Sequence, residues 1–112
     1  MFYLHAKIHT MAGTILEDGW MQVENGKILA LGDGTPPAGC GDTFDCGGLS
    51  MYPGFFDAHT HLGMMEDGLT FEGDDVNEDS DPVTPQLRAI DGLNPLDRDF
   101  REAVEAGVTA VV

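Results

Sequence analysis

Short apolar runs separated by turn residues dominate the first half of the chain. Residues 2–9 alternate loosely between apolar and polar side chains, and 20–23 and 27–31 are apolar runs on either side of Glu24-Asn25-Gly26. Asn-Gly between two apolar runs is a strong hairpin signal, because both turn residues tolerate positive φ. The pattern predicts that residues 1–52 form part of a small β-sandwich.

The pattern changes after Pro53. The apolar run that follows predicts a buried strand over residues 55–59, and a long acidic loop then extends from Leu62 to about Asn94. A loop of this length is unusual in a compact domain unless it has a function. For such a run of charge, however, a solvated surface is the default interpretation. Eight acidic residues fall within sixteen positions of the loop: Glu66, Asp67, Glu72, Asp74, Asp75, Glu78, Asp79 and Asp81.

A helix and a second strand are predicted beyond this loop. Asn94 and Pro95 suit a helix cap and a first helical turn, and apolar residues then recur at helical spacing until Gly107, a typical residue at a helix C-terminus. The β-branched run 108–112 favours a strand that is buried on both faces. Strand, loop, helix and strand form a βαβ unit with parallel strands, which predicts the α/β class with a β-rich first half.

The predicted parallel pair is too small to be a complete domain. Two parallel strands cannot cover their own faces or edges, and a complete (β/α)8 barrel needs about 250 residues. The 112 residues of the sequence are therefore expected to be the opening part of a longer enzyme.

Two histidines stand two positions apart at the end of the first of these strands. On an extended backbone the side chains alternate, so Asp57, His59 and His61 are expected to share one face. The Cα atoms of the two histidines would then lie about 7 Å apart, close enough for both rings to hold one ion. Neutral imidazole is a common ligand of divalent metals, so the spacing predicts a metal site. A histidine pair with only a structural role is the alternative.

The segment from Pro53 to His61, PGFFDAHTH, resembles the first barrel strand of the amidohydrolase superfamily, most closely of its cyclic-amidohydrolase and imidazolonepropionase-related members. AGVT, at residues 106–109, resembles the start of the second barrel strand in that family. The resemblance implies a partial N-terminal β-sandwich over residues 1–52 and the start of a metal-dependent (β/α)8 barrel over 53–112. Pro53 and Gly54 would shape the passage from one to the other.

The same resemblance implies residue roles and a reaction. His59 and His61 would bind a divalent metal, zinc in our prediction, and Asp57 would orient one of the ligand imidazoles. The implied reaction is hydrolysis of a C–N bond other than a peptide bond, in a small-molecule substrate such as a cyclic amide.

Family members complete the metal site with a carboxylated lysine or a glutamate, two further histidines and an aspartate. After His61 this chain has no histidine, and its lysines, Lys7 and Lys27, lie in the first half. A catalytic zinc site needs about three protein ligands, so we expect the isolated chain to be inactive. The alternative function is a non-catalytic domain that forms homo-oligomers through unpaired strand edges.

Charge and hydropathy exclude several partners. The net charge of −15 argues against nucleic acid, because only five cationic residues are present to neutralise phosphates. No apolar stretch approaches the length of a membrane span, and the first residues lack the layout of a signal peptide. We therefore expect a cytoplasmic protein without a membrane partner. Cys40 and Cys46 are expected to be reduced thiols.

Arg88 is a candidate for holding a substrate carboxylate, since it is a lone cation in the acidic loop; pairing with a nearby carboxylate is the alternative. The same loop imitates a calcium site from Asp75 to Asp81, but the sixth position is Ser80 instead of Gly and the twelfth is Gln86 instead of Glu, which excludes that motif.

His5 and His9 are expected to share a strand face with Lys7, which predicts a solvated surface in preference to a second metal site. Met64 follows the histidine pair closely, and packing is the interpretation that we favour over a substrate contact.

Overall fold

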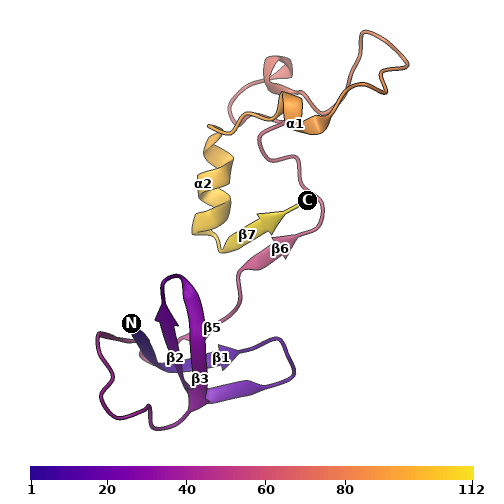
Figure 1. Ribbon diagram of the computed structural model, residues 1–112. Helices are drawn as coiled ribbons and strands as arrows, with labels where there is room; N and C mark the ends of the chain where they lie inside the picture. Colours follow the sequence, from indigo (N-terminus) through magenta and orange to yellow (C-terminus); the bar gives the residue numbers. More distant parts are fainter. The chain divides into compact units, whose positions relative to one another are not determined.

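The computed structural model describes every residue from Met1 to Val112. The chain divides into two compact units, Met1–Pro53 and Gly54–Val112, next to the division expected between residues 52 and 53. The first unit contains strands only, whereas the second contains two strands and the helices (Figure 1). None of the helices combines the length and the apolar character that crossing a membrane requires.

The first unit is built on one five-stranded sheet. The order is β3-β2-β1-β4, with β5 also paired to β1. The β1–β2 and β2–β3 pairs are antiparallel, whereas β4 and β5 run parallel to β1. The strands of this unit form a single sheet, and the partial β-sandwich expected over residues 1–52 stays a prediction. The strands are β1 (Phe2–His9), β2 (Ile15–Glu24), β3 (Lys27–Asp33), β4 (Thr43–Asp45) and β5 (Ser50–Met51).

The hairpin predicted at Asn25-Gly26 is confirmed. Glu24 pairs with Lys27 across the turn, and φ is positive at both turn residues, 51° for Asn25 and 72° for Gly26. A two-residue turn of this kind matches the right-handed twist of the strands that it joins. The two turn residues therefore determine how β2 and β3 are connected.

A bulge at His5 in β1 explains why two short strands, β4 and β5, pair with β1 in place of one long strand. His5 has a φ of 55°, and the β1–β2 register shifts between Tyr3 and Ala6. On the other side of β1, the amide of Gly48 donates to the carbonyl of His5 at 2.7 Å. Gly47 and Gly48 both have positive φ, 59° and 81°, which glycine adopts readily. β4 and β5 thus lie along one edge of the sheet and are separated where β1 bulges.

The core of the first unit is small. Ala6, Ile8 and Cys46 are buried together. Gly19 lies opposite Ala6, and a Cβ added to Gly19 would lie 2.8 Å from Ile8 Cδ1, so this position leaves room for the Ile8 side chain. Both cysteines are free thiols, as expected. The residues that pack around this core are Tyr3, Leu16, Met21 and Met51.

His5 and His9 differ in their surroundings. The His5 side chain is exposed, as expected for a solvated surface. His9 is half-buried, its ring stacks on Tyr52 at 4.2 Å between ring centres, and its Nε2 is buried. The solvated surface predicted for both histidines is therefore wrong for His9, because Tyr52 covers the ring.

The ion pair between His5 and Asp18 makes the stability of the sheet depend on pH. His5 Nδ1 lies 3.0 Å from Asp18 Oδ1, and this hydrogen bond raises the pKa of His5 above its ordinary value of 6.5. The charge of Asp18 raises this pKa further. Because the folded-state pKa is the higher one, the pair contributes stability below pH 6.5, and this contribution is lost as pH rises through the folded-state pKa.

We expect the urea midpoint of the chain to fall more between about pH 6 and about pH 8 than that of a His5→Gln variant, because the variant cannot lose this ion pair. Urea titrations of both proteins at the two pH values measure the difference. An identical pH dependence in the two proteins would show that the pair contributes nothing to stability.

The second unit has the predicted order of strand, loop, helix and strand. Its two strands, β6 and β7, pair in parallel, with Phe55 opposite Val108 and Asp57 opposite Val111. Two short helices in the acidic loop were not predicted. The elements are β6 (Phe55–Asp57), a 3-10 turn (Phe71–Gly73), α1 (Ala89–Gly92), α2 (Arg98–Glu105) and β7 (Val108–Val111).

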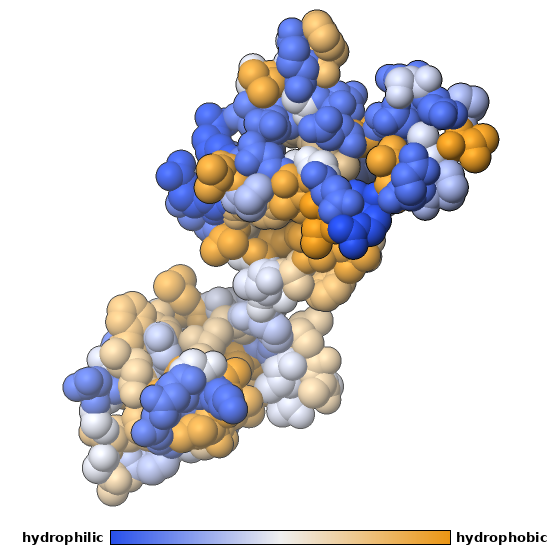
Figure 2. Space-filling view, turned by 45° about the horizontal axis from the view of Figure 1, so that its top comes forward, coloured by the Kyte–Doolittle hydropathy of each residue, from blue (hydrophilic) through white to orange (hydrophobic).

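Both strands are shorter or more exposed than predicted. β6 ends at Asp57, two positions before the predicted end, because the Asp57 side chain bonds the amide of His59 at 3.2 Å and bends the chain. The predicted burial of the strands is wrong: Phe55 is 59% exposed, Phe56 is 66% exposed and Val112 is 74% exposed. Figure 2 shows apolar side chains gathered at the part of the second unit that carries this pair. α2 contacts β7 but not β6, so much of the pair has no layer to cover it.

α2 begins later than predicted and ends where predicted. Its cap is Asp97, whose side chain accepts from the amide of Asp99. Asn94 instead accepts from the amide of Leu96 at 3.0 Å, which forms a separate turn ahead of the helix. Gly107 follows the helix with a φ of 92°, as its C-terminal glycine should. The predicted cap, Asn94, is therefore wrong, and Asp97 is the cap of α2.

Candidate functional site

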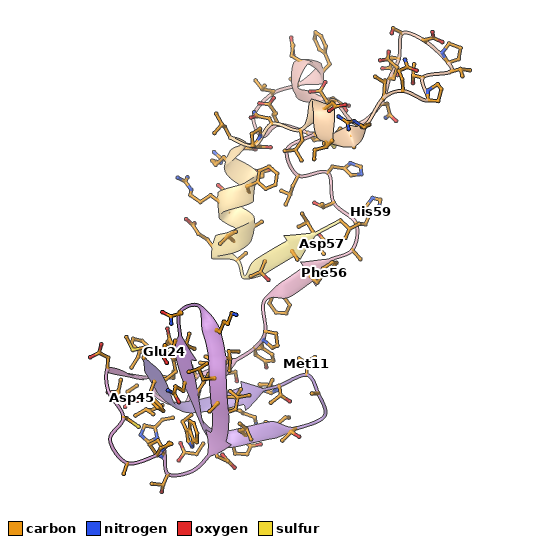
Figure 3. The ribbon with its side chains drawn as sticks, in the orientation of Figure 1. Met11, Glu24, Asp45, Phe56, Asp57 and His59 are labelled. Atoms are coloured by element: carbon orange, nitrogen blue, oxygen red, sulfur yellow. The ribbon has the colours of Figure 1, made fainter.

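The rings of His59 and His61 lie beside each other just after β6. Their centres are 5.2 Å apart and their planes are inclined by 48°. Two imidazoles that bind one tetrahedral zinc ion through nitrogens at about 2.0–2.1 Å have ring centres about 5 Å apart. The observed separation therefore fits a shared ion. Figure 3 shows His59 and Asp57 at the end of β6.

Hydrogen bonds beyond β6 position the segment that carries the two rings. The amide of Val112 donates to the carbonyl of Asp57 at 3.0 Å, and the amide of Thr60 donates to the carbonyl of Val112 at 3.2 Å. Thr60 lies between the two histidines, so Val112, the residue that follows β7, fixes the backbone between them. After His61, the amide of Met64 donates to the His61 carbonyl at 2.9 Å and closes a turn. The rings thus project from a hydrogen-bonded bend, not from the extended strand that the sequence predicted.

Asp57 acts on the backbone of this bend. Its Oδ1 accepts from the amide of His59 at 3.2 Å. The carboxylate therefore sets the direction in which the chain leaves the strand and, with it, the position of the His59 ring. The predicted contact between Asp57 and a ligand imidazole stays a prediction.

The chain brings two imidazoles together without a third ligand. No three side chains of the His, Cys, Asp and Glu types lie close enough to one another to hold a metal ion. The other histidines, His5 and His9, belong to the first unit. Two ligands are fewer than the three or so of a catalytic zinc site.

A hollow of about 300 Å³ adjoins His61. A second, larger hollow of about 540 Å³ shares four lining residues with it: Met64, Val76, Asn77 and Ala89. Met64 therefore faces open space that a ligand can enter, in addition to its packing contacts. The sequence did not predict that Val76, Asn77 and Ala89 line this hollow. They are distant from His61 in the sequence, and only the folded loop brings them close to it.

The start of the acidic loop is folded against α2. Gly63 is buried with a φ of 75°, and its carbonyl accepts from the amide of Asn94 at 2.8 Å. A Cβ added to Gly63 would lie 2.7 Å from Phe100 Cε2, so the ring of Phe100 packs directly on the glycine. Further along, the amide of Asp75 donates to the carbonyl of Met64 at 2.8 Å. These contacts place the loop so that its residues form the walls of both hollows.

Arg88 pairs with a carboxylate of its own loop. Its Nε donates to Asp91 Oδ2 at 3.0 Å and its Nη2 donates to Asp91 Oδ1 at 2.7 Å. This two-point hydrogen bond raises the pKa of Arg88 above its ordinary value. The structure thus shows the alternative given for Arg88, which is pairing with a nearby carboxylate. A role of Arg88 in holding a substrate carboxylate stays a prediction.

Comparison with solved structures and curated proteins gives close matches over most of the chain. Residues covering 98% of the chain superpose on 28% of the crystal structure of an amidohydrolase from Thermotoga maritima MSB8, with a TM-score of 0.83 and 34% sequence identity. Amidohydrolase tasK of Hapsidospora irregularis is 34% identical over 95 residues, which cover 82% of this chain and 10% of that protein. The chain belongs to the amidohydrolase superfamily.

A third relative supports the same membership. The imidazolonepropionase of Sphingopyxis alaskensis is 31% identical over 117 aligned positions, covering 96% of this chain and 27% of that protein. No family model matches the chain. The membership predicted from PGFFDAHTH is confirmed, and the chain spans between 10% and 28% of the length of these three proteins.

Proposed function

We propose that the chain supplies two metal ligands, His59 and His61, to a hydrolase that cleaves C–N bonds other than peptide bonds in small molecules such as cyclic amides. The similarity to amidohydrolases supports the hydrolase class. The observation that carries the ligand role is the 5.2 Å separation of the two ring centres. In this proposal β1–β5 belong to a β-sandwich, and β6 and β7 are the first strands of a (β/α)8 barrel.

The proposed metal is a divalent ion, with zinc as our choice because imidazole nitrogen is one of its usual ligands. His59 and His61 would hold this ion, which would supply a water of lowered pKa and a positive charge that polarises a carbonyl. The chain's own part is to hold the rings. Asp57 keeps the His59 backbone in its bend, and Thr60 ties the segment to β7 through the carbonyl of Val112.

We further propose that the chain by itself does not turn over substrate. Its histidine pair provides two nitrogens, whereas a catalytic zinc site needs about three protein ligands and an open position. The remaining ligands would come from residues outside this sequence, as the partial coverage of its relatives allows.

A chimera tests the proposed activity. In it, this chain replaces the matching 28% of the Thermotoga maritima amidohydrolase, and the assay uses a substrate that the unmodified Thermotoga protein hydrolyses. We expect zinc-dependent hydrolysis by the chimera, a loss of at least about 100-fold on His59→Ala or His61→Ala, and no turnover by the isolated chain. A folded, zinc-loaded chimera that hydrolyses nothing would contradict the proposed function. Turnover by the isolated chain that disappears on His59→Ala would contradict its inactivity.

Self-association is a second candidate function, and the exposure of the β6–β7 pair favours it. Both strands of a two-stranded sheet are edge strands, and Phe55 and Phe56 are 59% and 66% exposed. A second copy that covers these groups would form a homo-oligomer without any catalytic site. Sedimentation of the chain at micromolar concentration distinguishes the outcomes, since a stable monomer would contradict this candidate.

We propose a cytoplasmic protein whose partner is a small molecule, with neither nucleic acid nor membrane as a partner. The net charge of −15 supports the part of this proposal that concerns nucleic acid and anionic membranes, because such a chain is repelled by phosphate groups.

A further inference from the structure

The larger hollow, which we call the acidic hollow, has an unbalanced charge. The charged side chains that line it are Asp75, Glu78, Arg88 and Asp91. Arg88 and Asp91 bind each other through two hydrogen bonds of 2.7 and 3.0 Å, so their charges compensate. Asp75 and Glu78 have no salt bridge to any cation. Two of its four charged lining residues therefore carry carboxylates that no cation neutralises.

Glu78 is held in its ionised form. Its Oε1 accepts from the hydroxyl of Ser80 and from the Ser80 amide, the latter at 2.6 Å. These hydrogen bonds, that of the hydroxyl first, lower the pKa of Glu78 below its ordinary value. Asp75 is fixed in the wall by its amide, which donates to the carbonyl of Met64 at 2.8 Å.

The second unit contains no unpaired arginine or lysine that could reverse this charge. The second unit has three arginines against fourteen acidic residues, and the two arginines outside the hollow are also paired. Arg98 pairs with Asp67 and with Glu102, and Arg101 pairs with Glu105. An anion in the hollow would meet carboxylates without a free guanidinium, whereas a cation would meet two favourable charges.

The acidic hollow continues to the histidine pair. Four of its lining residues also line the 300 Å³ hollow that includes His61. Met64 and Val76 offer apolar surface to a flat ring, and the Asn77 amide can both donate and accept hydrogen bonds. Hollows of about 300–1,000 Å³ are the usual size of small-molecule sites. The two hollows together therefore have the size of a small-molecule site, with Asp75 and Glu78 lining one and His61 lining the other.

We propose that the acidic hollow is the substrate pocket of this site and that Asp75 and Glu78 select a small cationic nitrogen compound, such as an amidinium or a guanidinium, over an anionic one. The inference rests on the proposed function, because it names the substrate class of the same site. Arg88 then serves to hold Asp91, and the substrate carboxylate predicted as its partner has no place in the pocket.

Benzamidinium and benzoate test this selection, because they are nearly equal in size and opposite in charge. Each is titrated into the isotope-labelled chain, and the amide resonances of Val76 and Asn77 are followed by NMR. We expect benzamidinium to bind at least about 10-fold more tightly than benzoate at low salt. We expect the double variant Asp75→Asn/Glu78→Gln to lose at least about 5-fold in affinity for benzamidinium.

The matched control is Asp79→Asn/Asp81→Asn, which removes the same charge from the same loop at positions that do not line the hollow. Its affinity for benzamidinium should change less than about 2-fold. Equal binding of the two probes overturns the proposal, as does an equal loss in both double variants. Tighter binding of benzoate that is lost on Arg88→Gln also overturns it and restores the anion-binding role of Arg88. Because neither probe needs a metal, failure of zinc binding at the histidines contradicts only the proposed function.

Discussion

Replacing His59 or His61 by alanine should lower the affinity of the chain for zinc by at least about 10-fold, since even the loss of a residue that merely orients a zinc ligand costs about 10- to 100-fold. The two rings lie with their centres 5.2 Å apart, so a single ion can bind both, and either variant leaves one imidazole alone. Calorimetric titration with zinc measures the affinity.

Excess magnesium in this titration keeps zinc from binding to the carboxylates of the acidic loop. Magnesium occupies carboxylates and leaves imidazole free, so the remaining zinc binding reports on nitrogen ligands. His5→Ala is the matched control, because His5 is an exposed histidine of the first unit. If His5→Ala weakens zinc binding as much as His59→Ala does, the ion does not bind specifically at the proposed pair.

Gly63→Ala should destabilise the second unit by about 2–4 kcal/mol, the combined cost of a strained backbone and an overpacked contact. Gly63 has a φ of 75°, and its added Cβ would lie 2.7 Å from Phe100 Cε2 and 3.0 Å from the carbonyl oxygen of Asn94. Neither neighbour can withdraw freely, because Phe100 belongs to α2 and Asn94 is hydrogen-bonded to Gly63 itself. Urea unfolding followed by helix ellipticity measures the loss.

Gly68→Ala separates the two parts of this cost. Gly68 has nearly the same φ, 78°, but a Cβ there meets nothing within 4 Å. We expect Gly68→Ala to cost about 1 kcal/mol from the backbone alone. Equal losses in the two variants would show that Phe100 does not pack on Gly63 as described.

The elements set by local chemistry were predictable from the sequence. Asn25 and Gly26 form the hairpin turn because both tolerate positive φ, and Gly107 ends α2 for the same reason. The neighbouring rings of His59 and His61 also followed from their spacing, although the strand ends before them. The rings of His59 and His61 lie close together as long as the chain does not reverse its direction between them.

Features that depend on competition between nearby groups were harder to predict. Asp57 ends β6 because its side chain bonds the amide of His59, an alternative to the ladder that apolar patterning does not reveal. Asp97 caps α2 although Asn94 is equally suited by type, and the choice depends on the turn that Asn94 makes first.

Burial and the hollows depended on tertiary structure. Phe55 and Phe56 belong to a sequence that suits a buried strand, yet a strand is buried only where another layer covers it, and α2 contacts β7 but not β6. Val76, Asn77 and Ala89 reach His61 only because Gly63 and Met64 anchor the loop. No spacing in the sequence marks these residues as neighbours.

The claim on which the account depends is that one ion binds both His59 and His61. X-ray absorption at the zinc edge of the zinc-loaded chain tests it most directly. We predict two imidazole nitrogens at about 2.0–2.1 Å from the ion, and one in each single alanine variant. A zinc ion surrounded by oxygen atoms alone, with no imidazole signal, would contradict it.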